Sequence, residues 1–388
     1  MIPRKFLKFS FINFILLLTV YGGNQLDKSI IFPLGLKSIQ SYRIPGIVVT
    51  KKGTVLAYCE ARHNNAADWG EIEIYLRRST DSGVTWSEAK AVAHSGQRFE
   101  GNPHKLIDGV HEQTVNNPVA IVDHITGNIE FLYCINYAHC FSMRSCDDGL
   151  TWSKPIEITQ VFEAFRKFYN WKVIATGPGH GIQLKNGRLI VPIWIAYGKV
   201  GDHGPSAAAT IYSDDHGLTW KAGDMAITPN SDITNPNETT AAELSDGRII
   251  LINRNTSKFN RKLVTFSSSG VDAWSKPIFQ KELWEPQCMA SIINYPLIPG
   301  ILLFSCPHTL SQDLNKHEIP GAKGKRENLT VQMSRDDGKT WLISHVIEQE
   351  KSAYSDLAIL SDGSIICMYE SIRGIVTVRF SLDWLETN

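Results

Sequence analysis

The segment Ser79-Thr80-Asp81-Ser82-Gly83-Val84-Thr85-Trp86 decides how the fold of this chain has to be interpreted. The same pattern, Ser-x-Asp-x-Gly-x-Thr-Trp, returns in full at residues 145–152, 213–220 and 334–341, and a degraded copy occupies residues 267–274. Successive copies start between 54 and 68 residues apart. A motif repeated at nearly constant spacing indicates one supersecondary unit used several times, so we expect a repeat architecture.

Each octet is predicted to form a tight turn between two β-strands. Its Asp carboxylate can accept hydrogen bonds from nearby backbone N–H groups, and its Gly tolerates a positive φ. The Thr and Trp that follow suit a strand, where the indole supplies a large apolar surface. Calcium-binding loops are the alternative, but the octet has too few carboxylates to enclose that ion with protein ligands alone. We therefore expect the octet carboxylates to hold hairpins together, with a weaker turn at Ser269, which replaces the Asp of the degraded copy; these carboxylates are Asp81, Asp147, Asp215 and Asp336.

The rest of the chain predicts an all-β fold. Short β-rich runs such as 44–49, 54–59 and 188–194 alternate with Gly, Asn and Asp turns, and only residues 161–168 suggest a helix. Repeats of this length, with about four strands each, can close radially into a β-propeller. We therefore predict one domain over residues 24–388, a six-bladed β-propeller with four-stranded antiparallel blades. A stacked solenoid is the alternative, although solenoids usually have shorter repeats.

Two terminal runs are candidates for closing the ring. Residues 29–36 and 376–385 both have strand-like sequences although they lie at opposite ends of the chain. We expect them to share one blade, because pairing the first and last strands fastens a propeller against opening.

The overall charge gives no sign of a polyanionic partner. The 388 residues include 39 Lys and Arg and 39 Asp and Glu, so the formal net charge is zero. Binding of nucleic acid or of an anionic membrane by bulk electrostatics is therefore not expected. Any role of arginine has to come from its local placement.

The amino terminus has the composition of an export signal. Arg4, Lys5 and Lys8 precede an almost wholly apolar run over residues 9–21. We interpret residues 1–23 as a cleaved signal peptide, which predicts a secreted or periplasmic protein without stable membrane insertion after cleavage. A membrane anchor is the alternative, but the run is short for a span.

No cofactor is indicated by the cysteines. Seven are spread along the chain without a Cys-x-x-Cys pair, so neither a zinc site nor a complete set of disulfides is expected. We predict mostly buried free thiols, and no metal or organic cofactor.

Several polar residues outside the octets are not explained by the repeat. These residues are Tyr42-Arg43-Ile44-Pro45, Glu60-Ala61-Arg62 with Asp68 six residues on, Asn237-Glu238 with Arg254, Arg326 before Leu329-Thr330-Val331, and Ser352-Ala353-Tyr354-Ser355-Asp356-Leu357. Taken together, in this order and with the octets, they resemble the exo-α-sialidases of the bacterial and animal neuraminidase family, in which the octets are called Asp boxes. The resemblance covers nearly all of the chain after residue 23. The resemblance also implies the six-bladed propeller.

The resemblance implies a set of three arginines that binds the carboxylate of the substrate, here called the clamp. Sialic acid carries a carboxylate on its anomeric carbon, and planar guanidinium groups can bind it with paired hydrogen bonds. By resemblance these groups are Arg43, Arg254 and Arg326, and Glu370 holds the first of them. Arg62 corresponds to the arginine that contacts a substituent of the sugar ring. A solvated surface position is the usual alternative for a single arginine.

Tyr354 is the predicted nucleophile. A carboxylate nucleophile would be repelled by the substrate carboxylate, whereas a phenol is neutral, and sialidases with a Tyr nucleophile are known. A phenol has a pKa near 10 and needs a base, which Glu238 matches. Asp68 fits the general acid/base that protonates the leaving oxygen and then activates water. The alternatives are a core tyrosine for Tyr354 and a turn-capping role for Asp68.

The function predicted from the sequence is hydrolysis of terminal α-linked sialic acids from glycoproteins, glycolipids or oligosaccharides, with retention of configuration. A trans-sialidase, or a variant that releases anhydro-sialic acid, remains open because these differ only in what attacks the intermediate. A glycan-binding propeller without activity is the alternative from another class, and it would not need the complete residue set. Part of the segment 97–113 is expected to form the rim of the substrate site that contacts the glycerol or N-acyl group of the sugar. His180 is expected to be structural.

Overall fold

The computed structural model describes residues 26–35, 39–63, 67–99, 112–198, 203–312, 318–320 and 325–387. The predicted signal peptide at 1–23 lies outside these residues, as does most of the segment 97–113. None of the helices in the described ranges combines the length and the apolar character that a bilayer span requires.

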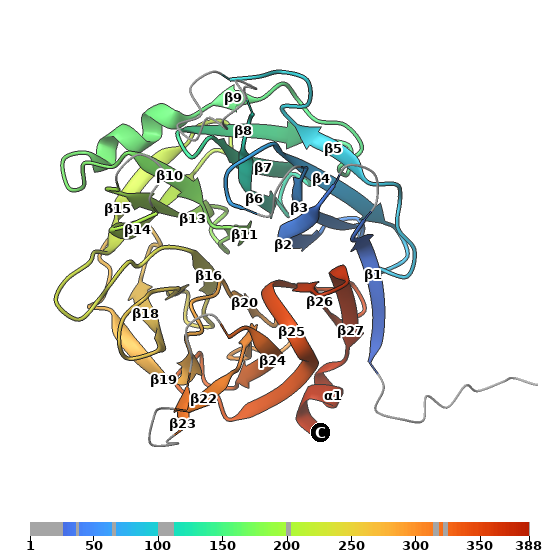
Figure 1. Ribbon diagram of the computed structural model, residues 1–388, viewed down its shortest axis with the longest axis vertical. Helices are drawn as coiled ribbons and strands as arrows, with labels where there is room; N and C mark the ends of the chain where they lie inside the picture. Colours follow the sequence, from blue (N-terminus) through green and yellow to red (C-terminus); the bar gives the residue numbers. More distant parts are fainter. Residues whose placement is uncertain are drawn as a thin grey trace, which may run out of the picture.

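The described chain is a ring of β-sheets around a common centre (Figure 1), in which β2, β11, β16 and β20 lie nearest to that centre. The strand pairing is antiparallel except that the short strand β11 pairs in parallel with β6. Four blades are separate sheets of four or five strands. The first of these sheets contains β2 (Ser41–Val49), β3 (Val55–Arg62), β4 (Ile72–Ser79) and β5 (Lys90–Ala93). The second contains β11 (Gly179–His180), β6 (Val115–Val122), β7 (Ile129–Ile135), β8 (His139–Ser145) and β9 (Ile156–Glu157), and the third contains β10 (Val173–Thr176), β12 (Ile182–Gln183), β13 (Leu189–Ala196), β14 (Ser206–Ser213) and β15 (Lys221–Ile227). The fourth contains β16 (Thr239–Glu243), β17 (Ile249–Asn253), β18 (Arg261–Ser267) and β19 (Ile278–Trp284).

A seven-stranded sheet fills the remaining sector of the ring. Its strands, in spatial order, are β1 (Asp27–Pro33), β27 (Gly374–Phe380), β26 (Ile365–Ser371), β25 (Ile343–Ile359), β24 (Glu327–Ser334), β21 (Leu302–Pro307) and β20 (Ser291–Asn294). The prediction of six separate four-stranded blades is therefore wrong: four blades stand alone. The physical reason is the 17-residue strand β25, whose first part pairs with β24 and whose second part pairs with β26, so the last strands stay joined.

The prediction that the two ends of the chain share a sheet is confirmed. β1 pairs antiparallel with β27, for example through Ser29 opposite Thr377. Figure 1 shows this first strand lying beside the last one. The ring is therefore closed by backbone hydrogen bonds between residues more than 300 positions apart, which is how a propeller avoids leaving an open sheet edge.

Helices make up little of the described chain. A 3-10 helix, η1 (Thr159–Phe165), overlaps the helix expected over 161–168, and the short helix α1 (Leu382–Thr387) ends the described chain. A small hairpin of β22 (Leu310–Gln312) and β23 (Glu318–Pro320) completes the elements.

The core lies between neighbouring blades. Strands inside a blade, such as β13, are apolar along their whole length; every residue of β13 is buried because both of its faces are covered. One apolar cluster joins Ile190 and Ala208 of one sheet to Leu251 and Leu263 of the next. Each blade therefore depends on its neighbours for burial, as expected for a repeat architecture.

The octets form turns, as predicted. In the first copy the Asp81 carboxylate accepts hydrogen bonds from the Thr85 backbone N–H at 2.9 Å and from the Thr85 hydroxyl at 2.5 Å. Gly83, with φ of +85°, takes the left-handed conformation that the turn requires. In the degraded copy the Ser269 hydroxyl replaces the carboxylate, and it accepts longer bonds of 3.2 Å from the backbone N–H groups of Val271 and Asp272.

Candidate active site

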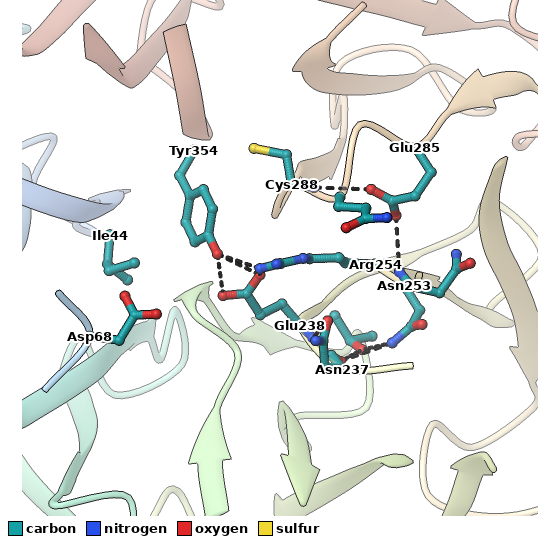
Figure 2. Close-up of polar contacts among 12 residues, drawn as sticks. Ile44, Asp68, Asn237, Glu238, Asn253, Arg254, Glu285, Cys288 and Tyr354 are labelled. Atoms are coloured by element: carbon teal, nitrogen blue, oxygen red, sulfur yellow. Dashed lines mark hydrogen bonds and ion pairs between the residues drawn. The ribbon is translucent and has the colours of Figure 1, made fainter. Parts of the chain in front are cut away.

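Tyr354, Glu238 and Arg254 converge on one point. The Tyr354 hydroxyl lies 2.7 and 2.8 Å from the two carboxylate oxygens of Glu238, and Arg254 Nη1 donates to the same hydroxyl at 2.5 Å. Arg254 Nη1 also forms an ion pair with Glu238 Oε2. Figure 2 shows the three side chains pointing toward one another. A phenol, a carboxylate and a fixed cation are thus in direct contact.

The register of β16 and β17 brings Glu238 and Arg254 together. These strands are antiparallel with Thr239 opposite Asn253, so the residues just outside this pair also face each other. The Arg254 N–H donates to the Glu238 carbonyl at 2.8 Å. A base and an arginine 16 positions apart in the sequence therefore emerge side by side at the same end of the hairpin.

Two more arginines surround the Tyr354 ring. The guanidinium carbons of Arg43, Arg254 and Arg326 lie 5.2, 5.9 and 5.3 Å from its centroid. These side chains come from three different sheets, at β2, after β17 and before β24. Three permanent positive charges around one phenol suit the binding of a planar anion, such as a carboxylate, that accepts hydrogen bonds from several guanidinium groups.

Glu370 holds the first of these arginines. Arg43 Nε donates to Glu370 Oε1 at 2.9 Å, and the same oxygen accepts the backbone N–H of Ile44 at 2.9 Å. Ile44 has φ of +57°, which is strained for a β-branched residue, and the pairing of β2 with β3 shifts register between Arg43 and Gly46. This bulge turns Arg43 toward the site, and Glu370 fixes the strained backbone.

Burial and charge act in opposite directions on Tyr354. Its side chain is almost fully buried, and burial raises the pKa of the phenol well above its usual value, while Arg254, Arg326 and Arg43 lower it and Glu238 raises it. The net effect is a protonated phenol at neutral pH, in contact with a carboxylate that can take its proton.

Asp68 lies on another side of Tyr354 (Figure 2) and belongs to an ion network. Its Oδ1 lies 3.0 Å from Arg62 Nη1 and 4.0 Å from Arg43 Nη1, and its side chain is 46% exposed. Burial raises the pKa of Asp68, but Arg62, Arg43 and His203 lower it more, so the carboxyl pKa lies below its usual value. Asp68 is the most exposed of the predicted catalytic groups.

Glu60 fixes Arg62, and sequence reasoning did not single it out. Arg62 is 1% exposed and donates from Nε and Nη2 to Glu60 Oε2 at 3.0 and 2.7 Å. The other oxygen of Glu60 accepts the backbone N–H of Asn117 at 3.0 Å. The sequence signals were its place in the matched segment Glu60-Ala61-Arg62 and its position two residues before Arg62, which places both side chains on the same face of β3.

His180 lies near the centre of the ring, away from the point where Tyr354, Glu238 and Arg254 meet. Its Nδ1 lies 2.7 Å from Asp356 Oδ1, and that carboxylate also accepts the Ile47 N–H and the Ser291 hydroxyl at 2.9 and 2.8 Å. Asp356 therefore joins three inner strands and supports β25, the strand that carries Tyr354. A cavity of about 720 Å³ extends among the inner strands and includes His180, and none of the eight predicted site residues lines it.

No group of three His, Cys, Asp or Glu side chains in the described part of the chain is arranged as a metal site. The seven cysteines are free; six are buried and Cys146 is exposed.

Comparison with known proteins agrees with the fold and with the predicted family. A family model described as a BNR repeat-like domain matches residues 53–367. The sialidase of Micromonospora viridifaciens is 30% identical over 376 residues, covering 90% of this chain and 53% of the relative, and the sialidase of Bacteroides fragilis is 31% identical over 355 residues, covering 85% and 60%. The structure of the Hadza microbial sialidase Hz136 superposes with a TM-score of 0.73 at 27% identity, covering 89% of this chain and 66% of that one. The chain thus spans between about half and 60% of the length of these two curated relatives.

Proposed function

The chain belongs to the family of sialidases with BNR repeats, and on this premise we propose that it is an exo-α-sialidase. It removes terminal α-linked sialic acids from glycoproteins, glycolipids or oligosaccharides by a retaining mechanism. The observation that carries the proposal is the contact of the Tyr354 hydroxyl with Glu238 and Arg254, inside a ring of three guanidiniums. A glycan-binding propeller would have no use for a nucleophile and base in contact.

Substrate binding follows from the charges. The sialic acid carboxylate is bound by Arg43, Arg254 and Arg326, which places the anomeric carbon next to Tyr354. The guanidiniums remain charged at all working pH values, since Glu370 and Glu238 raise the pKa of Arg43 and Arg254 despite burial. Arg62 contacts a ring substituent next to Asp68.

The first chemical step forms a sialyl–tyrosine bond. Tyr354 attacks the anomeric carbon while Glu238 takes the phenol proton, and Asp68 donates a proton to the departing glycosidic oxygen. A neutral nucleophile avoids repulsion by the substrate carboxylate, which a carboxylate nucleophile would suffer. The bond from the anomeric carbon to the leaving oxygen breaks on the face opposite to Tyr354.

The second step releases sialic acid. Asp68, now ionised, takes a proton from water, the water oxygen attacks the anomeric carbon, and Tyr354 leaves with the proton returned by Glu238. Two inversions at the same carbon give net retention. We also propose that residues 1–23 direct export and that residues 24–388 form the catalytic domain.

The test is release of a fluorophore from an aryl α-sialoside, followed by proton NMR of the sugar. The wild-type protein is expected to release sialic acid first as the α-anomer. A folded wild type that releases nothing would refute the enzyme assignment, and a β-anomer formed first would refute the retaining mechanism.

A further inference from the structure

Lys262 and Glu285 form a buried ion pair that the proposed mechanism does not use. Figure 2 shows Glu285 on the side of Arg254 where Cys288 also lies. Lys262 Nζ, on β18, lies 2.9 Å from Oε2 of Glu285, which directly follows β19. Both side chains are only 1% exposed. Neither residue belongs to the motifs that pointed to the site, and neither touches Tyr354, Glu238 or Asp68 through a hydrogen bond.

The pair holds the backbone on both sides of the clamp. Glu285 Oε2 accepts the N–H of Asn255, the residue after Arg254, at 3.1 Å, and Glu285 Oε1 accepts the N–H of Cys288 at 3.0 Å. Lys262 Nζ donates to the Cys288 carbonyl at 2.5 Å. One carboxylate and one ammonium thus connect the backbone that carries Arg254 to the loop 285–290.

The same loop supports Arg326. Arg326 Nη2 donates to the carbonyl of Gln287, next to Cys288. Gln287 has φ of +56°, a conformation that a non-glycine residue keeps only when its surroundings hold it. The Cys288 thiol is fully buried between these charges: burial raises its pKa to about 11, although Arg326 and Lys262 oppose the shift.

Stability alone does not account for such a pair. Replacing a buried ion pair by apolar side chains of similar size is often neutral or stabilising, because two charges lose their hydration on burial. What an apolar pair cannot provide is acceptors and donors for the backbone groups of Asn255 and Cys288, which fix two segments relative to each other.

We propose that Lys262 and Glu285 are positioning residues that set Arg254 and Arg326 relative to each other, so that both guanidiniums bind one substrate carboxylate. This inference rests on the proposed function. The pair acts through the backbone of residue 255 and the loop 285–290 and does not contact substrate itself.

The test compares Glu285→Gln with a matched buried carboxylate outside the site. Glu130, on β7, is also 1% exposed and is paired with Arg144, so Glu130→Gln makes the same chemical change elsewhere. For each variant we would measure the melting temperature, kcat and KM on an aryl α-sialoside, and the dissociation constants of free sialic acid and its methyl ester.

Glu285→Gln is expected to raise KM and the dissociation constant of sialic acid roughly 10- to 100-fold, the effect of losing charge-assisted hydrogen bonds. The affinity for the methyl ester should change by less than about threefold, because the ester offers no carboxylate to the clamp. Glu130→Gln is expected to lower the melting temperature and to leave KM and both dissociation constants unchanged. Equal losses for acid and ester, or a sialic acid affinity within about twofold of wild type, would overturn the positioning role.

The double variant Lys262→Met/Glu285→Leu covers the case in which Glu285→Gln does not fold. It leaves no unpaired charge, so it is expected to fold and to show the same selective loss of carboxylate affinity. A double variant with wild-type KM overturns the inference and leaves the proposed function intact. A wild-type protein that neither binds sialic acid nor cleaves the sialoside overturns both.

Discussion

The Tyr354 hydroxyl faces both carboxylate oxygens of Glu238, at 2.7 and 2.8 Å. This contact joins β25 to the start of β16, two strands from different sheets. Because burial keeps the phenol protonated, the proposed mechanism requires the carboxylate to accept the phenol proton while the tyrosine attacks. The two residues therefore have to act as a unit, and removing either one should have nearly the full effect.

Tyr354→Phe and Glu238→Gln are each expected to lower kcat for an aryl α-sialoside by about 10²- to 10⁴-fold, the usual contribution of a nucleophile–base pair. The double variant should be little worse than either single variant, because both remove the same step. Steady-state kinetics of the three variants checks this. Multiplicative losses in the double variant would contradict the shared step.

Tyr369→Phe is the matched control. Tyr369, on β26, is fully buried, and its hydroxyl donates to Glu348 Oε2 at 3.0 Å, so it makes the same kind of contact outside the site. The variant should lose about 1 kcal/mol of stability, the net value of a hydrogen bond, and keep wild-type kcat. A comparable loss of kcat in this control would mean that the Tyr354 effect is not chemical.

The loss of activity in Asp68→Asn should depend on how much the leaving group of the substrate needs protonation. Arg62 and Arg43 hold the pKa of Asp68 below its usual value despite burial. In the proposed mechanism, Asp68 therefore gains its proton once the substrate carboxylate has neutralised part of this positive charge. Release from a sialyl oligosaccharide should fall about 10²- to 10⁴-fold. Release of a phenol with a low pKa should fall much less, because it departs without protonation. Parallel assays on the two substrates check this, and equal losses would exclude Asp68 as the general acid.

The octets made the architecture predictable but not the number of separate blades. Their turn chemistry is local, so Asp81 and Thr85 could be paired from the sequence with no knowledge of the fold. The joining of the last strands depends on the continuation of β25 through residues 351 and 352, where pairing passes from β24 to β26. No turn residue marks this point, and only the packing of two distant segments decides it.

The same distinction applies to the site. Tyr354 and Arg254 could be singled out because each stands in a short recognisable motif. Lys262 and Glu285 stand in no such motif, and the role of Glu60 could not be read from the matched segment Glu60-Ala61-Arg62. The partners of these three residues include backbone N–H groups of other segments, those of residues 117, 255 and 288. A buried carboxylate looks like any other Glu until the groups that pack around it are known.

The octet carboxylates predict a specific acid sensitivity. Hydrogen bonds from Thr85 lower the pKa of Asp81 to about 2, Thr151 does the same for Asp147, and Thr219 outweighs burial to give about 2 for Asp215. Since these folded-state pKa values lie below the usual 3.8, the stabilisation is present above pH ~4 and is lost as the pH falls toward 2. The triple variant Asp81→Asn/Asp147→Asn/Asp215→Asn should therefore show a smaller fall in urea midpoint from pH 5 to pH 2.5 than wild type.

Ser269→Ala provides the control for this acid sensitivity. The degraded octet uses a hydroxyl, which does not titrate in this range, so the variant should lose the same stability at pH 5 and at pH 2.5. An identical acid response in wild type and the triple variant would show that other carboxylates dominate.

The residue after the octet Asp joins neighbouring blades. In the second copy, Asp148 reaches the preceding sheet, where it accepts the hydroxyls of Thr50 and Thr54 at 2.5 Å each and pairs with Arg78 Nη2 at 3.0 Å. In the last copy, Asp337 likewise accepts the hydroxyl of Ser245 at 2.5 Å. The octets thus stabilise the ring between blades as well as each hairpin.

Asp148→Ala should cost about 3 kcal/mol or more, because it leaves Arg78 unpaired in a mostly buried place and removes two charge-assisted hydrogen bonds. Ser82→Ala is the matched control: it changes the same position of the first octet, also at positive φ, where no inter-blade hydrogen bond forms among the described residues, and it should cost less than about 0.5 kcal/mol. Urea unfolding of both variants measures the difference. Equal costs would show that the left-handed turn, and not the contact between blades, is what Asp148 stabilises.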